Sequence, residues 1–543
     1  MILRPYQQQA LDATDAAFTR VRSVLNVLAT GLGKTVIFSH VAKDYMTRGR
    51  VLILAHREEL LQQAGQKIHA IAGVRPDLEM GDSRASGLFR SPVVLTSVQT
   101  QTAGVNGHRR MHRFDPNEFS LLVVDECHHA VSPSNRAVID YYRQNPNLCV
   151  FGCTATPDRH DEEALGKVFE EVAFNYGIRE GIDDGWLCDI RQQFVEVTGL
   201  DFSACRTTAG DLNQKDLAAV MEAEKQLHGV VSATLDLCRG RRTLVFAASV
   251  SHGERMTEIF NRHEPGSTRF VCGATESVER RQTINKFRLG EFPCLVNVGI
   301  ATEGFDVPEI SAVVLARPTK SRSLYSQMVG RGTRPDAACI QHLFTPEDRR
   351  CAISNSAKAE LLVVDFVGNA GRHKLVHTAD ILGEGYSDEV VELAERLAKS
   401  RGTSRIREVL AEAEKLERMR HRIQEAAQRS VVRGKAEYRT SNVDPFNVFE
   451  LPARRERGWE VGKKATPNEV RYLAQLGDNA KAMSLAQASQ IIDEVVERSR
   501  LNLCTYKQAR LLRQHGYATD VSKSEASKII DGIAANGWRR VGT

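Results

Sequence analysis

The sequence lacks the features that mark secreted and membrane proteins. None of its eleven cysteines stands in a C-x-x-C pair, and because disulfide frameworks belong to small secreted chains, we expect reduced thiols here. The start, MILRPYQQQALDA, holds no apolar core of the signal-peptide kind, and no apolar run is long enough for a membrane span. These absences predict a cytoplasmic protein with no membrane partner.

A strong charge of one sign is also missing. The formal net charge is +5 in 543 residues, which permits a nucleic-acid partner without requiring one. The hydrophobic fraction of 42% and the charged fraction of 26% are ordinary for globular proteins. A chain of this length exceeds what one hydrophobic core normally serves, so we expect two or more domains.

The first 370 residues contain a series of short apolar runs. Continuous runs of Val, Leu and Ile with mixed stretches between them are typical of parallel strands buried on both faces. They form two groups and predict two α/β domains, at residues 1–165 and 166–380, with 166–200 as the connecting region. The runs lie at 23–30, 51–56, 93–98, 121–126 and 149–156, and then at 243–248, 294–299, 312–317 and 361–366.

From about Ser387 the composition changes. Glu, Arg, Leu and Ala at helical spacing predict a charged helical region over residues 381–440, most simply with solvated helix faces. A segment with prolines and a basic cluster follows and predicts a linker over residues 441–465.

Residues 466–543 contain a repeat. TPNEVRYLAQLG matches TYKQARLLRQHG 39 residues later, and ASQIID matches ASKIID. Each copy predicts a helical hairpin, whose first helix ends at Gly477 or Gly516 and whose second helix begins near Ser484 or Ser524. A binding or docking module for a protein partner and a simple cap on the chain are both consistent with this pattern.

ATGLGKT at residues 29–35 has the composition and place of a phosphate-binding loop. It lies between an apolar strand and a helix-like run, so its backbone N–H groups would face phosphate oxygens at a helix N-terminus. Lys34 is predicted to reach the β and γ phosphates of ATP, and the Thr35 hydroxyl to bind Mg²⁺. The full pattern begins with Gly six residues before the Lys, where this chain has Leu28. A glycine-rich structural turn is the alternative.

VVDECHH at residues 123–129 allows two kinds of site. At the end of an apolar strand, Asp125 would bind Mg²⁺ and Glu126 would lie near the attacking water of an ATPase. A zinc site is the alternative. On an extended segment, however, His128 and His129 would point to opposite sides, and four ligands at recurring spacing are lacking. We therefore expect an ATPase motif.

Nine motifs in a consistent order resemble those of superfamily 2 helicases of DEAD/DEAH type. The resemblance covers residues 4–370 and implies two tandem RecA-like motor domains, followed here by an α-helical C-terminal region. It also implies ATP hydrolysis in response to nucleic acid. The motifs are RPYQ (4–7), ATGLGKT (29–35), AHREEL (55–60), TSVQT (96–100), DECHH (125–129), TATP (154–157), LVFAASV (244–250), NVGIATEGFDVPEI (297–310) and QMVGRGTR (327–334).

The resemblance implies an ATP and Mg²⁺ site. Gln7 would read the adenine edge, and Arg4 and Tyr6 would frame the base. Lys34, Thr35, Asp125 and Glu126 would keep the roles predicted above. The other residues implied to bind the nucleotide are Thr30, Gly31, Gly33, Gly304 and Asp306, the last near the ribose.

Further residues are implied to couple hydrolysis to motion. Gln327, Arg331 and Arg334 match the last motif, where arginines act on the γ-phosphate and increase the rate about 10³- to 10⁵-fold. Because these arginines lie in the second domain, hydrolysis would depend on domain closure. His128, Thr154 and Thr156 would link hydrolysis to the segments that hold the nucleic acid.

The resemblance also implies a nucleic-acid path. Side chains there would contact phosphates and sugars, which predicts binding that is independent of sequence and sensitive to salt. Each of these residues could instead serve only the fold. They are His56, Arg57, Thr96, Ser97, Gln99, Thr275 and Thr302.

Within the superfamily, residues 307–334 most resemble RadD-type and UvsW-type DNA repair helicases of bacteria and phages, and also restriction-enzyme translocase subunits. A cysteine cluster like that of the RadD type and a nuclease domain like that of the restriction subunits are not evident. We predict an ATP-dependent DNA helicase or translocase for duplex, single-stranded or branched DNA, associated with a prokaryotic or phage nucleoid. The alternatives are an RNA helicase, an ATP-switched clamp, or the motor subunit of a restriction or defence complex.

Overall fold

The structure is a computed structural model. It describes residues 3–56, 58–85, 90–105, 108–155, 165–208, 210–300, 305, 307–370, 374–383, 385–431, 449, 462–476 and 483–535. The chain forms two compact units. The first contains Met1–Glu384 and Glu395–Val409, and the second contains Gly385–Ala394 and Leu410–Thr543.

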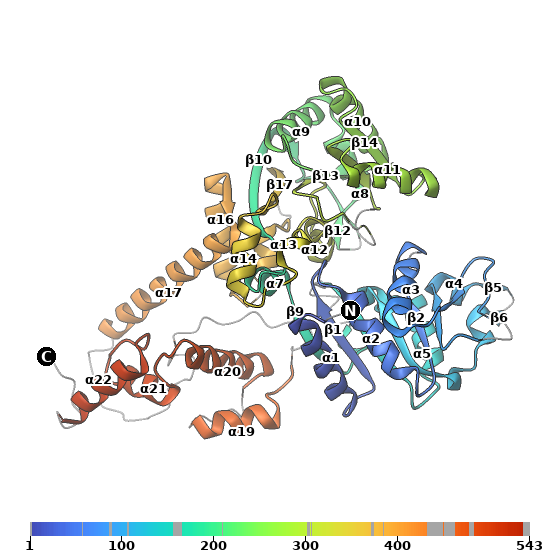
Figure 1. The fold of residues 1–543 in the computed structure, drawn as a ribbon. Coiled ribbons are helices and arrows are strands. Elements are labelled where there is room, and N and C mark those ends of the chain that lie inside the picture. The colour runs from blue at the N-terminus through green and yellow to red at the C-terminus, as the bar shows by residue number, and fades with distance from the viewer. Residues whose placement is uncertain are drawn as a thin grey trace. The chain divides into compact units, whose positions relative to one another are not determined.

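The first lobe of unit 1 is built on a parallel sheet, drawn in blue and cyan in Figure 1. Its strand order is β3-β4-β2-β7-β8-β1-β9. Every residue of β1, β4 and β8 is buried, as the apolar runs predict. The strands are β1 (Ser23–Leu28), β2 (Arg50–Leu54), β3 (Asp77–Glu79), β4 (Val93–Thr96), β7 (Phe119–Asp125), β8 (Cys149–Thr154) and β9 (Glu171–Tyr176).

Helices and short turns connect these strands. The helices are α1 (Pro5–Phe18), α2 (Lys34–Tyr45), α3 (Glu58–Ala72), α4 (Val98–Thr102) and α5 (Pro133–Tyr142), with the 3₁₀ turns η1 (Arg110–Arg113), η2 (Pro116–Glu118) and η3 (Cys127–Val131). A hairpin of β5 (Gly104–Val105) and β6 (His108–Arg109) follows α4.

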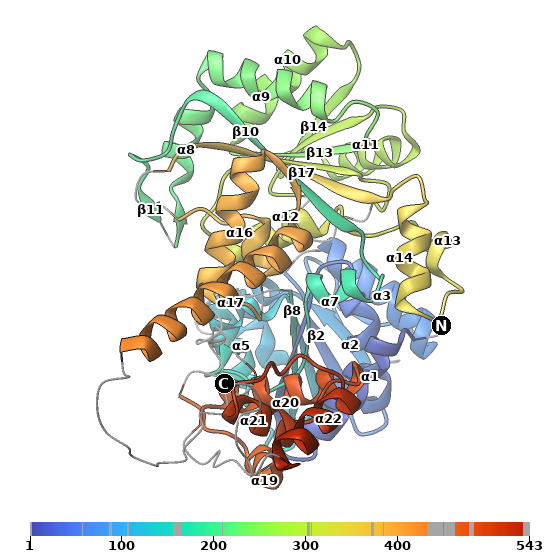
Figure 2. The same cartoon turned by 90° about the vertical axis from the view of Figure 1, so that its left-hand side faces the viewer.

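The second lobe contains a second sheet, of strand order β14-β15-β13-β16-β17-β10-β18. All its pairings are parallel except that of β18 with β10. In both Figure 1 and Figure 2, α9 and α10 cover one face of this sheet and α12 lies on the other. The strands are β10 (Asp189–Asp201), β13 (Thr243–Ala247), β14 (Thr268–Cys272), β15 (Cys294–Val298), β16 (Ala312–Ala316), β17 (Glu360–Asn369) and β18 (Thr403–Arg405).

The remaining elements of this part of the chain are mostly helical. They are α7 (Ile178–Asp183), the hairpin β11 (Thr207–Thr208) and β12 (Asp211–Leu212), α8 (Gln214–Met221), α9 (Glu224–Leu237), α10 (Val250–His263), α11 (Ser277–Leu289), α12 (Arg322–Gly330), α13 (Ala337–Ile340), α14 (Pro346–Ser354), α15 (Thr378–Leu382), α16 (Asp388–Arg401) and α17 (Ile406–Val431). Two parallel sheets with helices on their faces confirm the predicted pair of RecA-like α/β domains.

The sheets extend into segments that were predicted to be something else. β9 and all of β10 but its last residue lie within residues 166–200, which were predicted to connect the domains, and β9 pairs with β1 in the first sheet. β18 lies within the predicted charged helical region, 381–440. The reason is polarity: five of the six residues of β9 are only half-buried, and β18 is the polar tripeptide Thr-Ser-Arg. Neither strand carries a continuous apolar run.

The C-terminal repeat forms two helical hairpins in unit 2. Their helices are α19 (Pro467–Leu476), α20 (Leu485–Arg500), α21 (Tyr506–Gln514) and α22 (Lys523–Ala535). Ser484 caps α20 as predicted, Gly516 follows α21 with φ +75°, and α22 begins at Lys523, close to the predicted Ser524. Gly477 lies outside the described residues. Matching β-bridges, Lys464 to Ser484 and Leu503 to Ser522, close the two hairpins in the same way.

Within the described residues, no helix is long and apolar enough to cross a membrane.

Candidate nucleotide-binding site

The predicted phosphate loop joins β1 to α2. Gly31 and Gly33 have φ values of +91° and +81°, which glycine adopts without strain. A Cβ on Gly33 would lie 2.7 Å from Gln7 Nε2, and one on Gly31 would lie 2.8 Å from Arg334 Cγ. Leu28, which stands where the full pattern has Gly, is the last residue of β1 and is completely buried. The departure from the pattern is therefore a core residue, and the curl of the loop is preserved by the two later glycines.

Two carboxylates meet this loop at the end of β7. Lys34 Nζ lies 3.4 Å from Glu126 Oε1, and Glu126 itself has a left-handed backbone with φ +47°. A non-glycine residue in this region is uncommon and often marks a functional site. Burial, together with the neighbouring Glu126 carboxylate, raises the pKa of Asp125 to about 6, against the opposing effect of Lys34. Cys153 Sγ donates to Asp125 Oδ1 at 3.3 Å.

His128 connects these acids to β8. Its Nδ1 lies 3.0 Å from Thr154 Oγ1 and 3.6 Å from Glu126 Oε2, so the predicted coupling pair is in contact. Thr156 lies outside the described residues. The segment is the 3₁₀ turn η3 rather than an extended chain, and the rings of His128 and His129 are 4.0 Å apart. The expectation that these rings point to opposite sides is therefore wrong, because a tight turn brings them to one side. No cluster of three or more metal-binding side chains occurs in the described part of the chain.

The arginines of the last motif come from the end of α12. Arg331 Nη1 and Arg334 Nη2 donate to the carbonyl oxygen of Phe305 at 3.0 and 3.2 Å. Gln327 is buried within α12 and does not line the cavity described below. Gly304 and Asp306, predicted to close over the nucleotide, lie outside the described residues.

A cavity of about 480 Å³ is lined by residues of both lobes of unit 1. This volume lies within the range of small-molecule sites, about 300–1,000 Å³. The predicted residues on its wall are Thr30, Gly31, Gly33, Lys34, Thr35, Asp125, Glu126, Arg331 and Arg334. Four further polar residues, Gln63, Gln66 and Lys67 of α3 and Arg288 of α11, complete the wall and were not predicted. Five of these side chains are cationic and two are carboxylates, so the cavity suits a polyphosphate.

The predicted adenine-reading residues lie behind the phosphate loop and do not line this cavity. Gln7 Nε2 donates to the Leu32 carbonyl at 3.3 Å, and Gln7 Oε1 accepts from the Arg4 backbone at 3.0 Å. The hydroxyl of Tyr6 donates to the same Leu32 carbonyl at 2.8 Å. These side chains support the loop in the structure, so contact with a base would require them to exchange partners.

Trp186, between the two sheets, is a residue that the sequence analysis missed. The guanidinium carbons of Arg4 and Arg349 lie 4.7 and 3.9 Å from the centre of its ring, and Tyr6 meets the ring edge-on. Arg349, on α14, is 4% exposed and donates to the Asp184 carbonyl at 2.8 Å. The connection between the lobes is therefore held by cation–π contacts. No local sequence pattern predicts this contact, because Arg4 and Arg349 are both distant from Trp186 along the chain.

Lys358, a second residue that was not predicted, holds the backbone of the segment that carries Arg334. Its buried ammonium donates to the Pro308 carbonyl at 2.6 Å and also to the Arg334 carbonyl. The Cys188 backbone N–H donates to the Thr333 carbonyl at 2.7 Å. Burial lowers the pKa of Lys358 to about 8. Lysines are rarely buried, so this one has a specific role in ordering the backbone beside Arg334.

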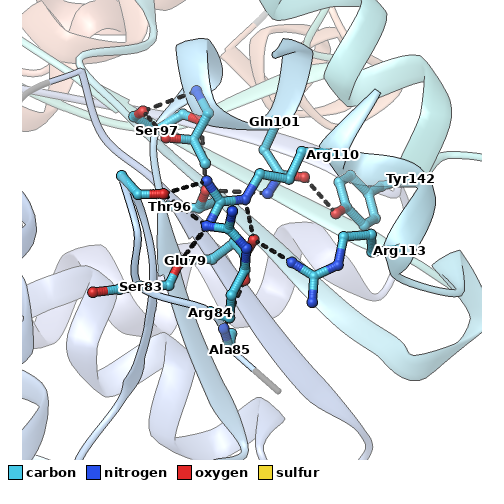
Figure 3. A network of polar contacts seen from close by, with 12 residues as sticks. Glu79, Ser83, Arg84, Ala85, Thr96, Ser97, Gln101, Arg110, Arg113 and Tyr142 are labelled. Carbon is cyan, nitrogen blue, oxygen red and sulfur yellow. Dashed lines mark hydrogen bonds and ion pairs between the residues drawn. The ribbon is translucent and has the colours of Figure 1, made fainter. Parts of the chain in front are cut away.

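The predicted nucleic-acid contacts divide into two kinds. Thr96 is completely buried, Ser97 is 3% exposed, and their hydroxyls accept from Gln101 Nε2 and from the Thr100 backbone at the start of α4 (Figure 3). The structure does not support nucleic-acid contacts for these two side chains, because their hydroxyls serve the fold. Thr275 likewise accepts from the Cys272 backbone at 3.0 Å.

His56 and Gln99 remain at the surface. They are exposed and 3.2 Å apart, from the ends of β2 and β4, and the His129 ring lies 5.3 Å from that of His56. Arg57 and Thr302 lie outside the described residues.

Two protein families match the chain. Residues 1–159 match "Type III restriction enzyme, res subunit", and residues 227–336 match "Helicase conserved C-terminal domain". A Saccharomyces cerevisiae protein named as an ATP-dependent helicase, IRC3, is 35% identical over 61% of this chain and 49% of its own length. A Schizosaccharomyces pombe protein named as a mitochondrial ATP-dependent helicase is 32% identical over 61% of this chain and 55% of its own. The chain spans about half the length of these relatives.

One solved structure, titled "ATP-dependent Type ISP restriction-modification enzyme LlaBIII bound to DNA", covers 99% of this chain and 40% of its own. Its TM-score is 0.53 at 15% identity, which supports the fold alone. The two family matches fall on the two lobes that form the cavity. Together they show that both lobes are similar to the domains of helicase-like ATPase motors.

Proposed function

We propose that the protein is an ATP-dependent DNA helicase or translocase that couples ATP hydrolysis to movement on duplex or branched DNA. The observation that carries this proposal is the cavity shared by the two lobes. The phosphate loop and two carboxylates come from one lobe and two arginines from the other. Hydrolysis assembled from two lobes depends on their closure, and closure is the motion that a motor needs.

Each group has a distinct role in this proposal. Lys34 and the N–H groups of the loop bind the phosphates, Glu126 orients the attacking water and accepts its proton, and Arg331 and Arg334 stabilise charge on the transferred phosphoryl group. The hydroxyl of Thr35 and the carboxylate of Asp125 are oxygen ligands of the kind that Mg²⁺ prefers. Asp125, whose pKa is raised by burial beside Glu126, gains a compensating charge when a cation binds. Mg²⁺ would neutralise part of the phosphate charge.

The DNA substrate and the subgroup are finer parts of the proposal. Motif resemblance to RadD-type and UvsW-type repair helicases supports DNA over RNA and a nucleoid location. A role for the C-terminal hairpins in docking a protein partner is supported by their separate core, which includes Leu473, Ile491 and Leu512.

The test is steady-state ATP hydrolysis without ligand and with single-stranded DNA, duplex DNA, forked DNA or single-stranded RNA. We expect forked or duplex DNA to stimulate turnover more than RNA, and Lys34→Ala to abolish it. Stimulation by RNA alone would instead indicate an RNA helicase. Bound ATP with no stimulation by any nucleic acid would indicate an ATP-switched clamp.

A second candidate is the motor subunit of a restriction or defence complex. It is favoured by the match of residues 1–159 to a restriction-subunit family. Purification from the native source would distinguish the two, because this candidate requires a nuclease on another chain to co-purify in a fixed ratio.

A further inference from the structure

The hairpin that follows α4 has no role in the proposed ATPase. We call Gly104–Val105, His108–Arg109 and Arg110–Arg113 the basic hairpin. Its second half reads HRRMHR, three arginines and two histidines with no acid. The base of the hairpin is tightly packed, because a Cβ on Gly104 would lie 2.0 Å from the His108 carbonyl oxygen. The Arg110 backbone N–H also donates to the Ala103 carbonyl at 2.7 Å.

A single buried carboxylate anchors the hairpin to the first sheet. Glu79, at the end of β3, is completely buried and accepts hydrogen bonds from Arg110 Nε and, at 3.2 Å, from Arg113 Nη1 (Figure 3). Arg110 also donates to the carbonyls of Gly81, at 2.7 Å, and Ser83. A buried carboxylate with two arginines is expensive to form unless its geometry is well satisfied. Arg110 and Arg113 therefore anchor the base of the hairpin to the lobe.

Arg109 differs from these two arginines in its contacts. Both His108 and Arg109 are exposed. No ion pair or hydrogen bond is found for the Arg109 guanidinium within the described part of the chain. Glu79 thus neutralises two of the three arginines and leaves the third for solvent or for an anionic partner. Because the base of the hairpin is anchored, binding through this guanidinium orders the Arg109 side chain and requires little further ordering of the backbone.

The strand order places Arg109 at the end of a row of exposed polar groups. The first sheet begins β3-β4-β2-β7, and the carboxyl ends of these parallel strands share one edge. The basic hairpin is held at the β3 end, Gln99 follows β4, His56 follows β2 and His129 follows β7. Gln99 contacts His56, and His56 lies beside His129. The row therefore leads from the hairpin toward the ATP-binding residues that end β7.

We propose that the basic hairpin is the outer nucleic-acid contact of the first lobe, with Arg109 binding a backbone phosphate. The proposal rests on the proposed function. A phosphate backbone fits better than an acidic protein, because the groups form a line along the sheet edge and the line continues into the nucleotide site. Backbone contact by arginine positions a strand without reading its sequence.

The test compares Arg109→Ala with a matched control, Arg20→Ala, in the full-length protein. Arg20 is also exposed, but it precedes β1 and pairs with Glu171 of β9, the strand at the opposite edge of the same sheet. Binding of a fluorescent forked DNA is measured by anisotropy over a series of salt concentrations, with ATP hydrolysis measured in parallel. We expect Arg109→Ala to bind several-fold more weakly and to lower the slope of log affinity against log salt by about 0.9 for a duplex contact. Arg20→Ala should match the wild type, and neither change should alter ATP hydrolysis without DNA.

Two other outcomes separate this inference from the proposed function. If the wild type binds DNA with a steep salt dependence and Arg109→Ala has the same affinity and slope, the hairpin contact is wrong while the motor assignment stands. If the wild type binds neither DNA nor RNA, both fail together.

Discussion

The two lobes supply the cavity with different chemistry by different means. The first lobe presents Lys34, Thr35, Asp125 and Glu126, all within two residues of a buried strand end or the start of a helix. The charged groups that the second lobe presents are all cations. Two of them, Arg331 and Arg334, follow α12 and have partners distant in sequence. Local backbone geometry thus builds the phosphate and acid half of the site. Long-range contacts build the arginine half, and in the proposed mechanism hydrolysis requires both halves.

Removing an arginine from the second lobe tests this dependence most strongly. Arg334→Ala should lower the rate of ATP hydrolysis about 10³- to 10⁵-fold, because its positive charge would no longer stabilise the transferred phosphoryl group. Steady-state turnover and equilibrium binding of ATP are the measurements. Arg288→Ala, which removes an exposed cation from the same lobe's cavity wall, is the control and should have a much smaller effect. Equal effects of the two changes would contradict a specific role for Arg334.

The corresponding change in the first lobe is Glu126→Gln. Loss of the proton acceptor should lower turnover about 10²- to 10⁴-fold. ATP binding should persist, because Lys34 and the loop N–H groups remain. Single-turnover hydrolysis and ATP binding by filter retention check this. Normal hydrolysis by Glu126→Gln would show that another group accepts the proton.

Lys358→Met tests whether the arginine half depends on backbone support. The change removes the buried ammonium that holds the carbonyls of Pro308 and Arg334. We expect kcat to fall about 10- to 100-fold, since small displacements of catalytic groups have effects of that order. KM for ATP should change less, because the first lobe is untouched. Lys286→Met, at an exposed position of α11, is the control. A thermal destabilisation without a change in kcat would indicate a purely structural role.

Lowering the pH should change the folding stability of the two lobes in opposite directions. His252 at the start of α10 is completely buried, its Nδ1 accepts from the Ala248 backbone at 3.1 Å, and burial lowers its pKa to about 4. Below its ordinary pKa the unfolded chain binds a proton at His252 and the folded lobe does not, so stability present above about pH 6.5 is lost as the pH falls. The pKa of Asp125 in the metal-free first lobe is raised instead, so there the folded state binds the proton more tightly than the unfolded chain. The stability that this gives is lost as the pH rises through about 6.

The predicted loss from His252 is about 1 kcal/mol between pH 7 and pH 5.5. Hydrogen exchange of each lobe at the two pH values measures it, with His252→Gln as the comparison. His252→Gln should flatten the acid response of the second lobe only. An unchanged response would mean that other groups dominate.

The sequence predicted interior strands well and edge strands poorly. All five interior strands of the first sheet and four of the five in the second correspond to the predicted apolar runs. The unpredicted strands include all four edges, which are β3, β9, β14 and β18, and the strand β10 beside one edge. Edge strands are covered on fewer sides, so their sequences need not be continuously apolar.

Site prediction followed the same division. Lys34, Thr35, Asp125 and Glu126 could be located from short patterns, because a glycine-rich loop after a buried strand and an acidic strand end have one usual geometry. The sequence could not show whether Thr96 and Ser97 contact nucleic acid, because a short polar segment has the same sequence pattern whether its hydroxyls cap a helix or face solvent. The roles of Trp186 and Lys358 could not be predicted from the sequence, because the residues that they contact are distant along the chain.

By itself, the sequence determined two parallel-sheet lobes, a phosphate loop and an acidic pair, because hydrophobic period and loop chemistry act over a few residues. Tertiary structure alone decided that Arg331 and Arg334 share a cavity wall with Lys34, that Lys358 supports them, and that Glu79 holds the basic hairpin with Arg109 outward. Those contacts join residues separated by tens to hundreds of positions. Charge and burial there depend on which segments fold together, a property that no local pattern contains.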